Sequence, residues 1–85
     1  ANLKDLLVIE HTIPEPGSAR ISIRGKLMLG FDSDQMDRLV SDLLAKGARE
    51  IVFDLSGLTH IDSTGIGRFI AAYNKIMPVD GARMR

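Results

Sequence analysis

The sequence predicts an α/β fold in which a mixed β-sheet is flanked by helices, with the element order β-β-α-β-α. Three observations predict it. Apolar residues first alternate with a period of two, then recur at helical spacing, and then form a short continuous run before a second helical stretch. A chain of 85 residues has room for one small domain. We therefore expect residues 1–85 to form a single domain.

The two N-terminal strands are predicted from strict alternation of apolar and polar residues. Residues 6–13 alternate first, and their inward side consists of Leu7, Ile9 and Ile13. Residues 19–27 alternate again, and their inward side includes Ile21 and Ile23. A cluster of proline, glycine and serine over residues 14–18 separates the two segments. Two alternating segments joined in this way are typical of an antiparallel hairpin.

The first helix is predicted from an apolar stripe at helical spacing, made of Met36, Leu39, Val40, Leu43 and Leu44. Asp32 is expected to cap its start, with Phe31 in position for a hydrophobic staple. Gly47 is expected to end it in the left-handed conformation. The following residues 51–55 are almost entirely apolar, which predicts a central strand covered on at least one face.

The second helix is predicted to begin near Ser63, after a loop over residues 56–62, and to end at Pro78. Its apolar stripe consists of Ile66, Phe69, Ile70, Tyr73 and Met77. We expect the sheet to be covered by Leu39 and Leu43 from the first helix and by Phe69 and Ile70 from the second. Residues 82–85 are compatible with the start of a further strand.

The composition argues against several classes of function. Eleven basic residues balance eleven acidic ones, so the chain lacks the charge expected of a protein that binds nucleic acid or an anionic membrane. Without cysteine it has no thiol nucleophile, and its two histidines and scattered aspartates lack metal-ligand spacing. Apolar stretches such as residues 6–9 are too short to cross a bilayer. We therefore expect a cytoplasmic protein that binds no metal, nucleic acid or membrane.

The residues with the most chemical information follow the predicted third strand and open the second helix, in the order Asp62-Ser63-Thr64-Gly65-Ile66-Gly67. A phosphate-binding loop is disfavoured, because the glycines lie well beyond the strand end and no Gly-Lys-Ser/Thr is present. A serine hydrolase is disfavoured too, because its Gly-x-Ser-x-Gly turn would need a glycine where Ile61 stands. We therefore expect no catalytic residue in this chain.

Two interpretations of the helix start remain open. Asp62 or Ser63 can cap the helix whatever else the segment does. Gly65 and Gly67 each cost up to ~1 kcal/mol relative to alanine inside a helix, so both need an explanation. One explanation is close packing against the sheet, and the other is a bare surface for a partner. A hydroxyl at Ser63 beside such a surface could be phosphorylated, which would add about −1.5 to −2 charge.

Residues 51–67 resemble the signature of STAS domains, the anti-sigma factor antagonists, most specifically in the element Asp62-Ser63-Thr64-Gly65-Ile66-Gly67. Two further segments are similar to the family pattern: Gly25-Lys26-Leu27 matches its Gly-x-Leu at the end of the second strand, and Ala48-Arg49-Glu50 matches its lead-in to the central strand. The resemblance covers nearly the whole chain. It implies a STAS-like mixed β-sheet flanked by helices.

The resemblance also implies a function, that of a non-enzymatic bacterial regulator of sigma factors and hence of transcription. It implies that Ser63 is the phosphorylated residue. The partner would be a serine kinase that doubles as the anti-sigma factor, and a phosphatase would restore the unphosphorylated form. ATP and Mg²⁺ belong to that kinase, so no cofactor is expected here. We expect the partner to contact the surface of Asp62, Ser63, Thr64, Gly65 and Arg68. Met28 stands where many switch-type members carry an aspartate.

An alternative is also implied by the resemblance. STAS modules occur in stressosomes and in anion-transporter-type proteins, where this chain would act as a protein-interaction or nucleotide-sensing domain. The family usually continues with a further strand and a C-terminal helix. We therefore expect residues 1–85 to be a C-terminally truncated domain. An uncovered sheet edge at that end would favour a homodimer with a second copy.

Overall fold

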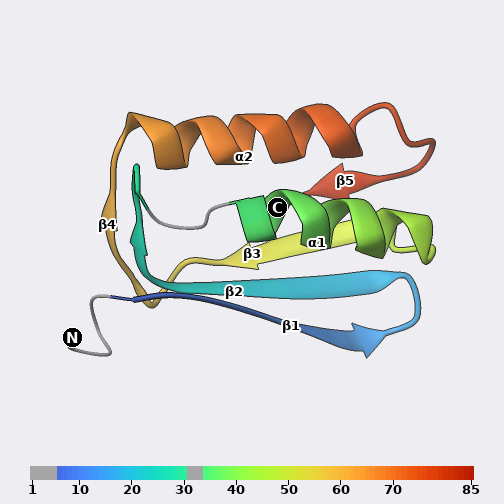
Figure 1. Cartoon of the computed structure of the whole chain (residues 1–85). Helices are drawn as coiled ribbons and strands as arrows, with labels where there is room; N and C mark the ends of the chain where they lie inside the picture. The colour runs from blue at the N-terminus through green and yellow to red at the C-terminus, as the bar shows by residue number, and fades with distance from the viewer. Residues whose placement is uncertain (1–5, 31–33) are drawn as a thin grey trace.

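A computed structural model describes residues 6–30 and 34–85. Two helices pack against one mixed sheet, as Figure 1 shows. The helices are α1 (Asp34–Ala45) and α2 (Ser63–Ile76). The strands are β1 (Leu7–Glu15), β2 (Ser18–Leu27), β3 (Glu50–Asp54), β4 (Leu58–Ile61) and β5 (Arg83–Met84). The predicted fold class is therefore confirmed.

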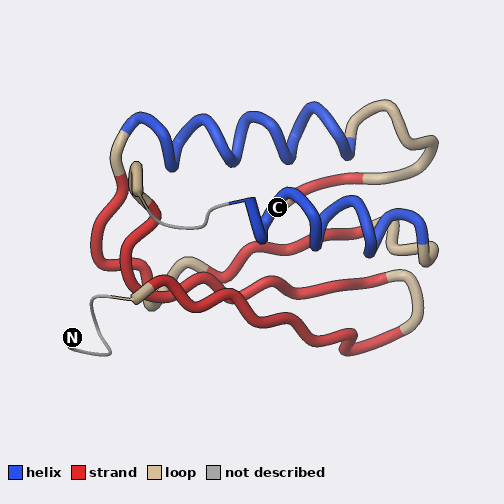
Figure 2. The backbone as a smooth tube through the Cα atoms, viewed as in Figure 1, coloured by secondary structure: helices blue, strands red, loops and turns tan. Residues whose placement is uncertain are grey.

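The sheet has the strand order β1-β2-β3-β5, and β4 pairs with β2 beyond the end of β3. β1 and β2 form the predicted antiparallel hairpin, whereas the pairs β2–β3, β3–β5 and β2–β4 are parallel. Residues 58–61 were expected to be a loop, and this prediction was wrong (Figure 2). The backbone N–H of Gly25 donates to the carbonyl of Gly57 at 3.0 Å, which brings the chain back alongside β2. A further strand within residues 82–85 is confirmed as β5.

The core lies on one face of the sheet. Inward residues of a strand all point to the same face, and on β2 these are the fully buried Ala19, Ile21 and Ile23. The same buried cluster contains residues from both helices and from β3, namely Met36, Val40, Leu43, Ile51, Ala72 and Ile76. Both helices therefore pack on one side of the sheet. Ile13 was expected to face inward, but its side chain is 59% exposed near the end of β1.

The sequence prediction for α1 is confirmed over the described residues. Met36, Val40 and Leu43 are buried, and Leu39 and Leu44 pack against the same cluster. Gly47 has a φ of 102°, so the chain leaves the helix through the left-handed conformation as expected. Phe31 and Asp32, which were expected to mark the helix start, lie outside the described residues.

The predicted apolar stripe of α2 was largely wrong. Ile70 was expected to cover the sheet but is 58% exposed, and the other half-exposed members of the stripe are Ile66, Tyr73 and Met77. The buried residues are instead Gly65, Ala72 and Ile76, and Phe69 packs edge-to-face on Phe53 with ring centroids 5.4 Å apart. Small residues allow the helix to approach the sheet closely on their side. The predicted stripe of larger residues lies one position further along the chain, which is about 100° around the helix, and therefore faces away from the sheet.

Besides the side against the sheet and the exposed apolar side, α2 has a third side that makes polar contacts with α1. Arg68 pairs with Asp34 at 3.1 Å. About two turns later, the ammonium of Lys75 pairs with Asp37 at 3.3 Å and donates to the Ser41 hydroxyl at 2.8 Å. These half-exposed groups contribute little energy individually, but together they define which side of α2 faces α1.

The first turn of α2 approaches the end of β2 very closely. A Cβ added to Gly65 would lie 2.2 Å from the carbonyl oxygen of Leu27 and 2.7 Å from Cγ1 of Ile61. A Cβ on Gly67 would meet nothing within 4 Å. Of the two explanations left open by the sequence, close packing therefore applies to Gly65 and a bare surface applies to Gly67.

This contrast gives a paired prediction. Gly65→Ala should lower the free energy of unfolding by about 1–3 kcal/mol, because the new methyl group overpacks a backbone contact. Gly67→Ala should leave it unchanged or raise it by up to ~1 kcal/mol, because alanine favours the helix and the site is open. Urea titrations of both variants check this. Equal effects of the two substitutions would contradict the packing assigned to Gly65.

Candidate functional site

The candidate site lies where three segments meet at one end of the sheet. β2 ends at Leu27, β4 ends at Ile61, and α2 begins at Ser63 (Figure 1). Ser63 is exposed as the first residue of α2. Its hydroxyl is thus presented at a helix N-terminus, where the backbone N–H groups favour negative charge.

Asp62 is the N-cap of α2 and uses both of its carboxylate oxygens. Oδ1 accepts the backbone N–H of Gly65 at 3.0 Å, which is the capping bond. Oδ2 accepts the backbone N–H of Leu29 at 3.0 Å, from the segment that follows β2. Of the two residues that could cap this helix, Asp62 does so. It also fastens the helix start to the end of β2.

These hydrogen bonds change the acidity of Asp62. The N–H of Leu29, followed by that of Gly65, holds the pKa of the Asp62 carboxyl below its ordinary value. Donors aimed at a carboxylate stabilise its charged form. The site therefore keeps a fixed negative charge beside Ser63 at neutral pH.

The five residues expected to contact a partner lie on the first turn and a half of α2 and its cap, but they point in different directions. Ser63 is exposed, whereas Asp62 and Thr64 are half-buried. Gly65 is buried against β2, and Arg68 reaches toward Asp34 of α1. Met28, at the position noted in the sequence, is half-buried directly after β2.

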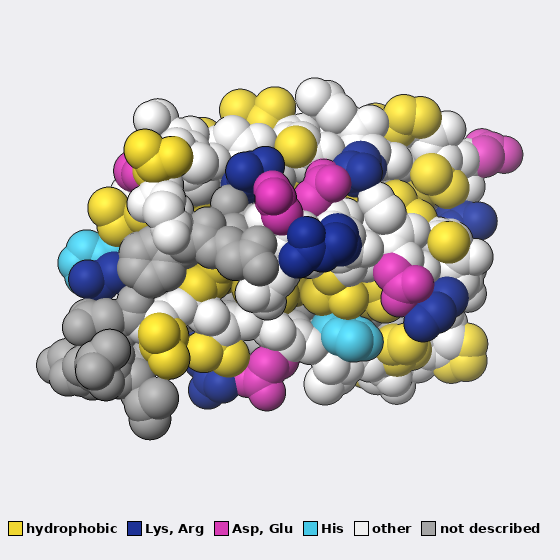
Figure 3. Space-filling view, viewed as in Figure 1, with side chains coloured by type: hydrophobic (Ala, Val, Ile, Leu, Met, Phe, Trp, Pro, Cys, Tyr) yellow, Lys and Arg dark blue, Asp and Glu magenta, His cyan; other side chains and the backbone are white. Residues whose placement is uncertain are grey.

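Sequence reasoning missed the exposed apolar residues around this site. Leu29 is 78% exposed and Ile66 is 53% exposed, and Ile61 at the end of β4 is also exposed. Figure 3 shows hydrophobic side chains reaching the surface over α2 and β4. Ile66 was assigned to the core because it fits the helical period. Leu29 carried a signal that could have been used, since it is a large apolar residue in a turn.

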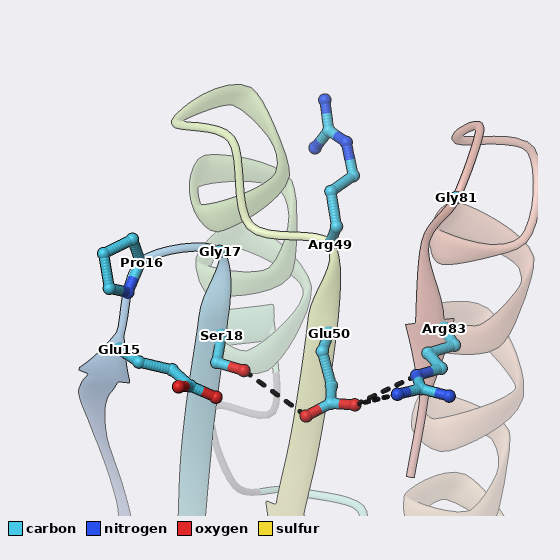
Figure 4. Close-up of a pocket in the computed structure, with 8 residues that line it drawn as sticks. All are labelled: Glu15, Pro16, Gly17, Ser18, Arg49, Glu50, Gly81 and Arg83. Atoms are coloured by element: carbon cyan, nitrogen blue, oxygen red, sulfur yellow. Dashed lines mark hydrogen bonds and ion pairs between the residues drawn. The ribbon is translucent and has the colours of Figure 1, made fainter.

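A polar hollow of about 440 Å³ lies at the other end of β2. Its lining, drawn in Figure 4, consists of Glu15, Pro16, Gly17, Ser18, Arg49, Glu50, Gly81 and Arg83. Glu50 accepts hydrogen bonds from the Ser18 hydroxyl at 3.3 Å and from Nε of Arg83 at 2.9 Å. These side chains join β2, β3 and β5 across the sheet, so we assign them a structural role.

Within residues 6–30 and 34–85, no group of three or more histidine, aspartate or glutamate side chains is arranged to hold a metal ion. In the same part of the chain, neither helix is long and apolar enough to cross a membrane.

The Asp62 hydrogen bonds predict a pH effect. Because the pKa is lowered in the folded state, their contribution to stability is fully present above the unfolded carboxyl pKa. It is lost as the pH falls through the folded value. In Asp62→Asn the amide cannot accept both N–H groups, so the variant should be less stable at pH 7, and the gap should narrow toward acid pH. Urea titrations across that range check this, with Asp42→Asn on α1 as the control. Parallel pH profiles for parent and Asp62→Asn would contradict the assignment.

Solved structures with a similar fold include two of SpoIIAA. The first is the anti-sigma factor antagonist SpoIIAA in its unphosphorylated form, with a TM-score of 0.74 and 19% identity over 91% of this chain and 69% of that one. The second is the Bacillus cell fate determinant SpoIIAA in the phosphorylated form, with a TM-score of 0.74 and 19% identity over 91% of this chain and 68% of that one. A third is an anti-sigma factor antagonist from Mycobacterium paratuberculosis, with a TM-score of 0.76 and 18% identity over 94% of this chain and 65% of that one.

The structural similarities establish the fold. A search of curated proteins by sequence finds no significant match. The STAS domain family model matches residues 13–82, which is most of the sequence. This chain therefore belongs to the STAS domain family.

Proposed function

We propose that this domain is an anti-sigma factor antagonist-like regulator. It binds a serine kinase that acts as the anti-sigma factor, and phosphorylation of Ser63 ends the interaction. The observation that carries the proposal is the exposed Ser63 hydroxyl at the start of α2 in a STAS domain. The fold is similar to that of SpoIIAA, an anti-sigma factor antagonist solved in both unphosphorylated and phosphorylated forms.

In the phosphorylation step this chain supplies only the acceptor hydroxyl. The Ser63 hydroxyl oxygen attacks the γ-phosphorus of ATP held by the kinase, the hydroxyl proton passes to a base of the kinase, and ADP leaves. This domain contributes an acceptor held in a fixed place. The Asp62 cap supplies that rigidity, because its two hydrogen bonds fix the turn from which Ser63 projects. The domain is thus a substrate and regulator, with ATP and Mg²⁺ on the kinase.

The phosphate changes the binding surface more than the fold. It adds about −1.5 to −2 charge at a helix N-terminus, where the helix dipole tolerates it. The Asp62 carboxylate lies next to it, with both oxygens already bound to backbone N–H groups. The partner then meets two adjacent negative groups, where the unphosphorylated surface presents the Asp62 carboxylate beside a neutral hydroxyl. A partner that fits the neutral surface is released, and a phosphatase restores binding.

The proposal also gives roles to the remaining residues expected at the interface. Thr64 and Arg68 are half-buried, so each presents an accessible part to a partner. Gly65 is buried and supports the interface indirectly, because it allows α2 to pack closely against the end of β2. Because the kinase and its ATP are cytoplasmic, the proposal places this domain in the cytoplasm.

Substitutions of Ser63 test the switch. Ser63→Ala should bind the kinase like the parent protein but accept no phosphate. Ser63→Asp should weaken binding by about tenfold or more, equivalent to ~1.4 kcal/mol, because it places a charge at the same point. The measurements are mass mapping of phosphate after incubation with kinase and ATP, and calorimetric titration of each variant.

Two matched controls sharpen this test. Thr64→Ala removes the neighbouring hydroxyl, and Ser56→Ala removes an exposed serine hydroxyl from the turn after β3. Both variants should still be phosphorylated at Ser63. Phosphate found on Thr64 alone, or unchanged affinity in Ser63→Asp, would refute the switch.

A further inference from the structure

β4 contains one residue more than its pairing with β2 accounts for. Leu58 lies opposite Gly25, and His60 lies opposite the next residue of β2, so that Thr59 is left out of the pairing. An extra residue of this kind is a β-bulge, and bulges next to functional sites re-aim the side chains that follow them. β4 leads through one residue into α2 (Figure 1). The bulge therefore lies just before the helix start that carries Ser63.

The side chain of Thr59 closes this bulge. Its hydroxyl donates to the carbonyl oxygen of Gly25 at 3.0 Å, and the N–H of Gly25 donates to the carbonyl of Gly57 at 3.0 Å. Nδ1 of His60 lies 3.0 Å from the same hydroxyl. Because the hydroxyl has a single proton, which goes to Gly25, the ring nitrogen is the donor in this second bond. Thr59 thus fastens the bulge to β2 with its side chain.

The extra residue decides which way the end of β4 faces. Residues three apart in a regular strand point to opposite faces, but Leu58 and Ile61 both point toward the helices. Leu58 packs against the core cluster, and Cγ1 of Ile61 would lie 2.7 Å from a Cβ on Gly65. A shift of one residue would turn Ile61 to the other face. Asp62 would then be turned away from the Leu29 N–H that it accepts at 3.0 Å.

We propose that Thr59 is a positioning residue for the phosphorylation of Ser63. Its hydroxyl holds the bulge against β2, the bulge places Asp62, and Asp62 caps the helix from which Ser63 projects. This inference rests on the proposed function, and it gives a role to a residue outside the helix and its cap. Thr59 acts on the acceptor through the backbone, without contact with ATP or the kinase.

Three variants separate this role from its alternatives. Thr59→Val keeps the shape of the side chain but removes the donor, and Thr59→Ser keeps the donor. Thr12→Val makes the same change at an exposed threonine of β1, which pairs with Arg20 near the opposite end of β2. The probe is a purified serine kinase of the anti-sigma class from the same organism, supplied with ATP and Mg²⁺.

The kinetic expectation is a change in kcat alone. Thr59→Val should lower the kcat for phosphorylation of Ser63 by about tenfold, because a small displacement of the acceptor is costly for phosphoryl transfer. The KM should stay close to the parent value, because the side chains around Ser63 are unchanged. Thr59→Ser and Thr12→Val should match the parent in both constants. Melting temperatures establish that each variant is folded under the conditions of the assay.

Amide hydrogen exchange tests the same role without the kinase. In Thr59→Val the N–H of Leu29 should exchange about tenfold faster, because the Asp62 carboxylate is no longer held within reach of it. The amide of Ile21, which is fully buried in β2, should exchange as in the parent. Thr59→Ser should restore the protection of Leu29.

Several outcomes would overturn the proposal. One is a Thr59→Val variant in which neither kcat nor the exchange of Leu29 changes. Another is a raised KM with an unchanged kcat, because Thr59 would then contact the kinase directly. Unfolding of Thr59→Val would give the hydroxyl a role in the stability of the whole domain instead. Absence of phosphate on Ser63 of the parent would refute the proposed function, whereas faster exchange of Leu29 would still support the positioning of the helix cap by Thr59.

Discussion

The start of α2 is held against the end of β2 by the carboxylate of Asp62 and by Gly65, which has no side chain to separate the helix from the strand. Asp62 accepts the backbone N–H of Gly65 in α2 and that of Leu29, two residues after β2. Gly65 allows the helix to touch the Leu27 carbonyl. Neither contact buries much apolar area, but together they fix where the helix begins and how it is rotated. A different rotation would turn Ser63 or Ile66 toward the sheet. The exposure of the candidate phosphoacceptor therefore depends on this junction.

The rotation set at the junction gives α2 three distinct sides. Its small and apolar residues Gly65, Ala72 and Ile76 lie against the sheet. Its cations Arg68 and Lys75 face acidic residues of α1. Its exposed side carries Ser63 followed by large apolar residues. The solvent face of the sheet has the opposite character, because ion pairs such as Glu10–Arg24 and Glu50–Arg83 cross between its strands. Exposed large apolar side chains thus begin beside Ser63 and continue along the exposed side of α2 to Met77.

The parts of this fold that follow local rules could be predicted from the sequence. The alternation in β2, the stripe of α1 and the left-handed Gly47 depend on neighbouring residues, and all three predictions are confirmed. The cap at Asp62 was predicted as one of two candidates for the same reason. β4 could not be predicted, because its residues become a strand through pairing with β2. The buried side of α2 could not be predicted either, because two apolar lines share one period and contact with distant Leu27 selects between them. Ser63 was found by its position and by family resemblance, while the exposure of Leu29 required the folded chain.

We infer that the kinase binds the end of the molecule formed by this junction. The most direct measurement is an NMR titration of the labelled, unphosphorylated domain with the kinase, following the backbone amides. We predict that the largest changes centre on Leu29, Ser63, Ile66 and Gly67. Amides on the solvent face of the sheet, such as those of Arg20 and Val52, should be unchanged. A footprint on that charged face, with the start of α2 unaffected, would contradict the account.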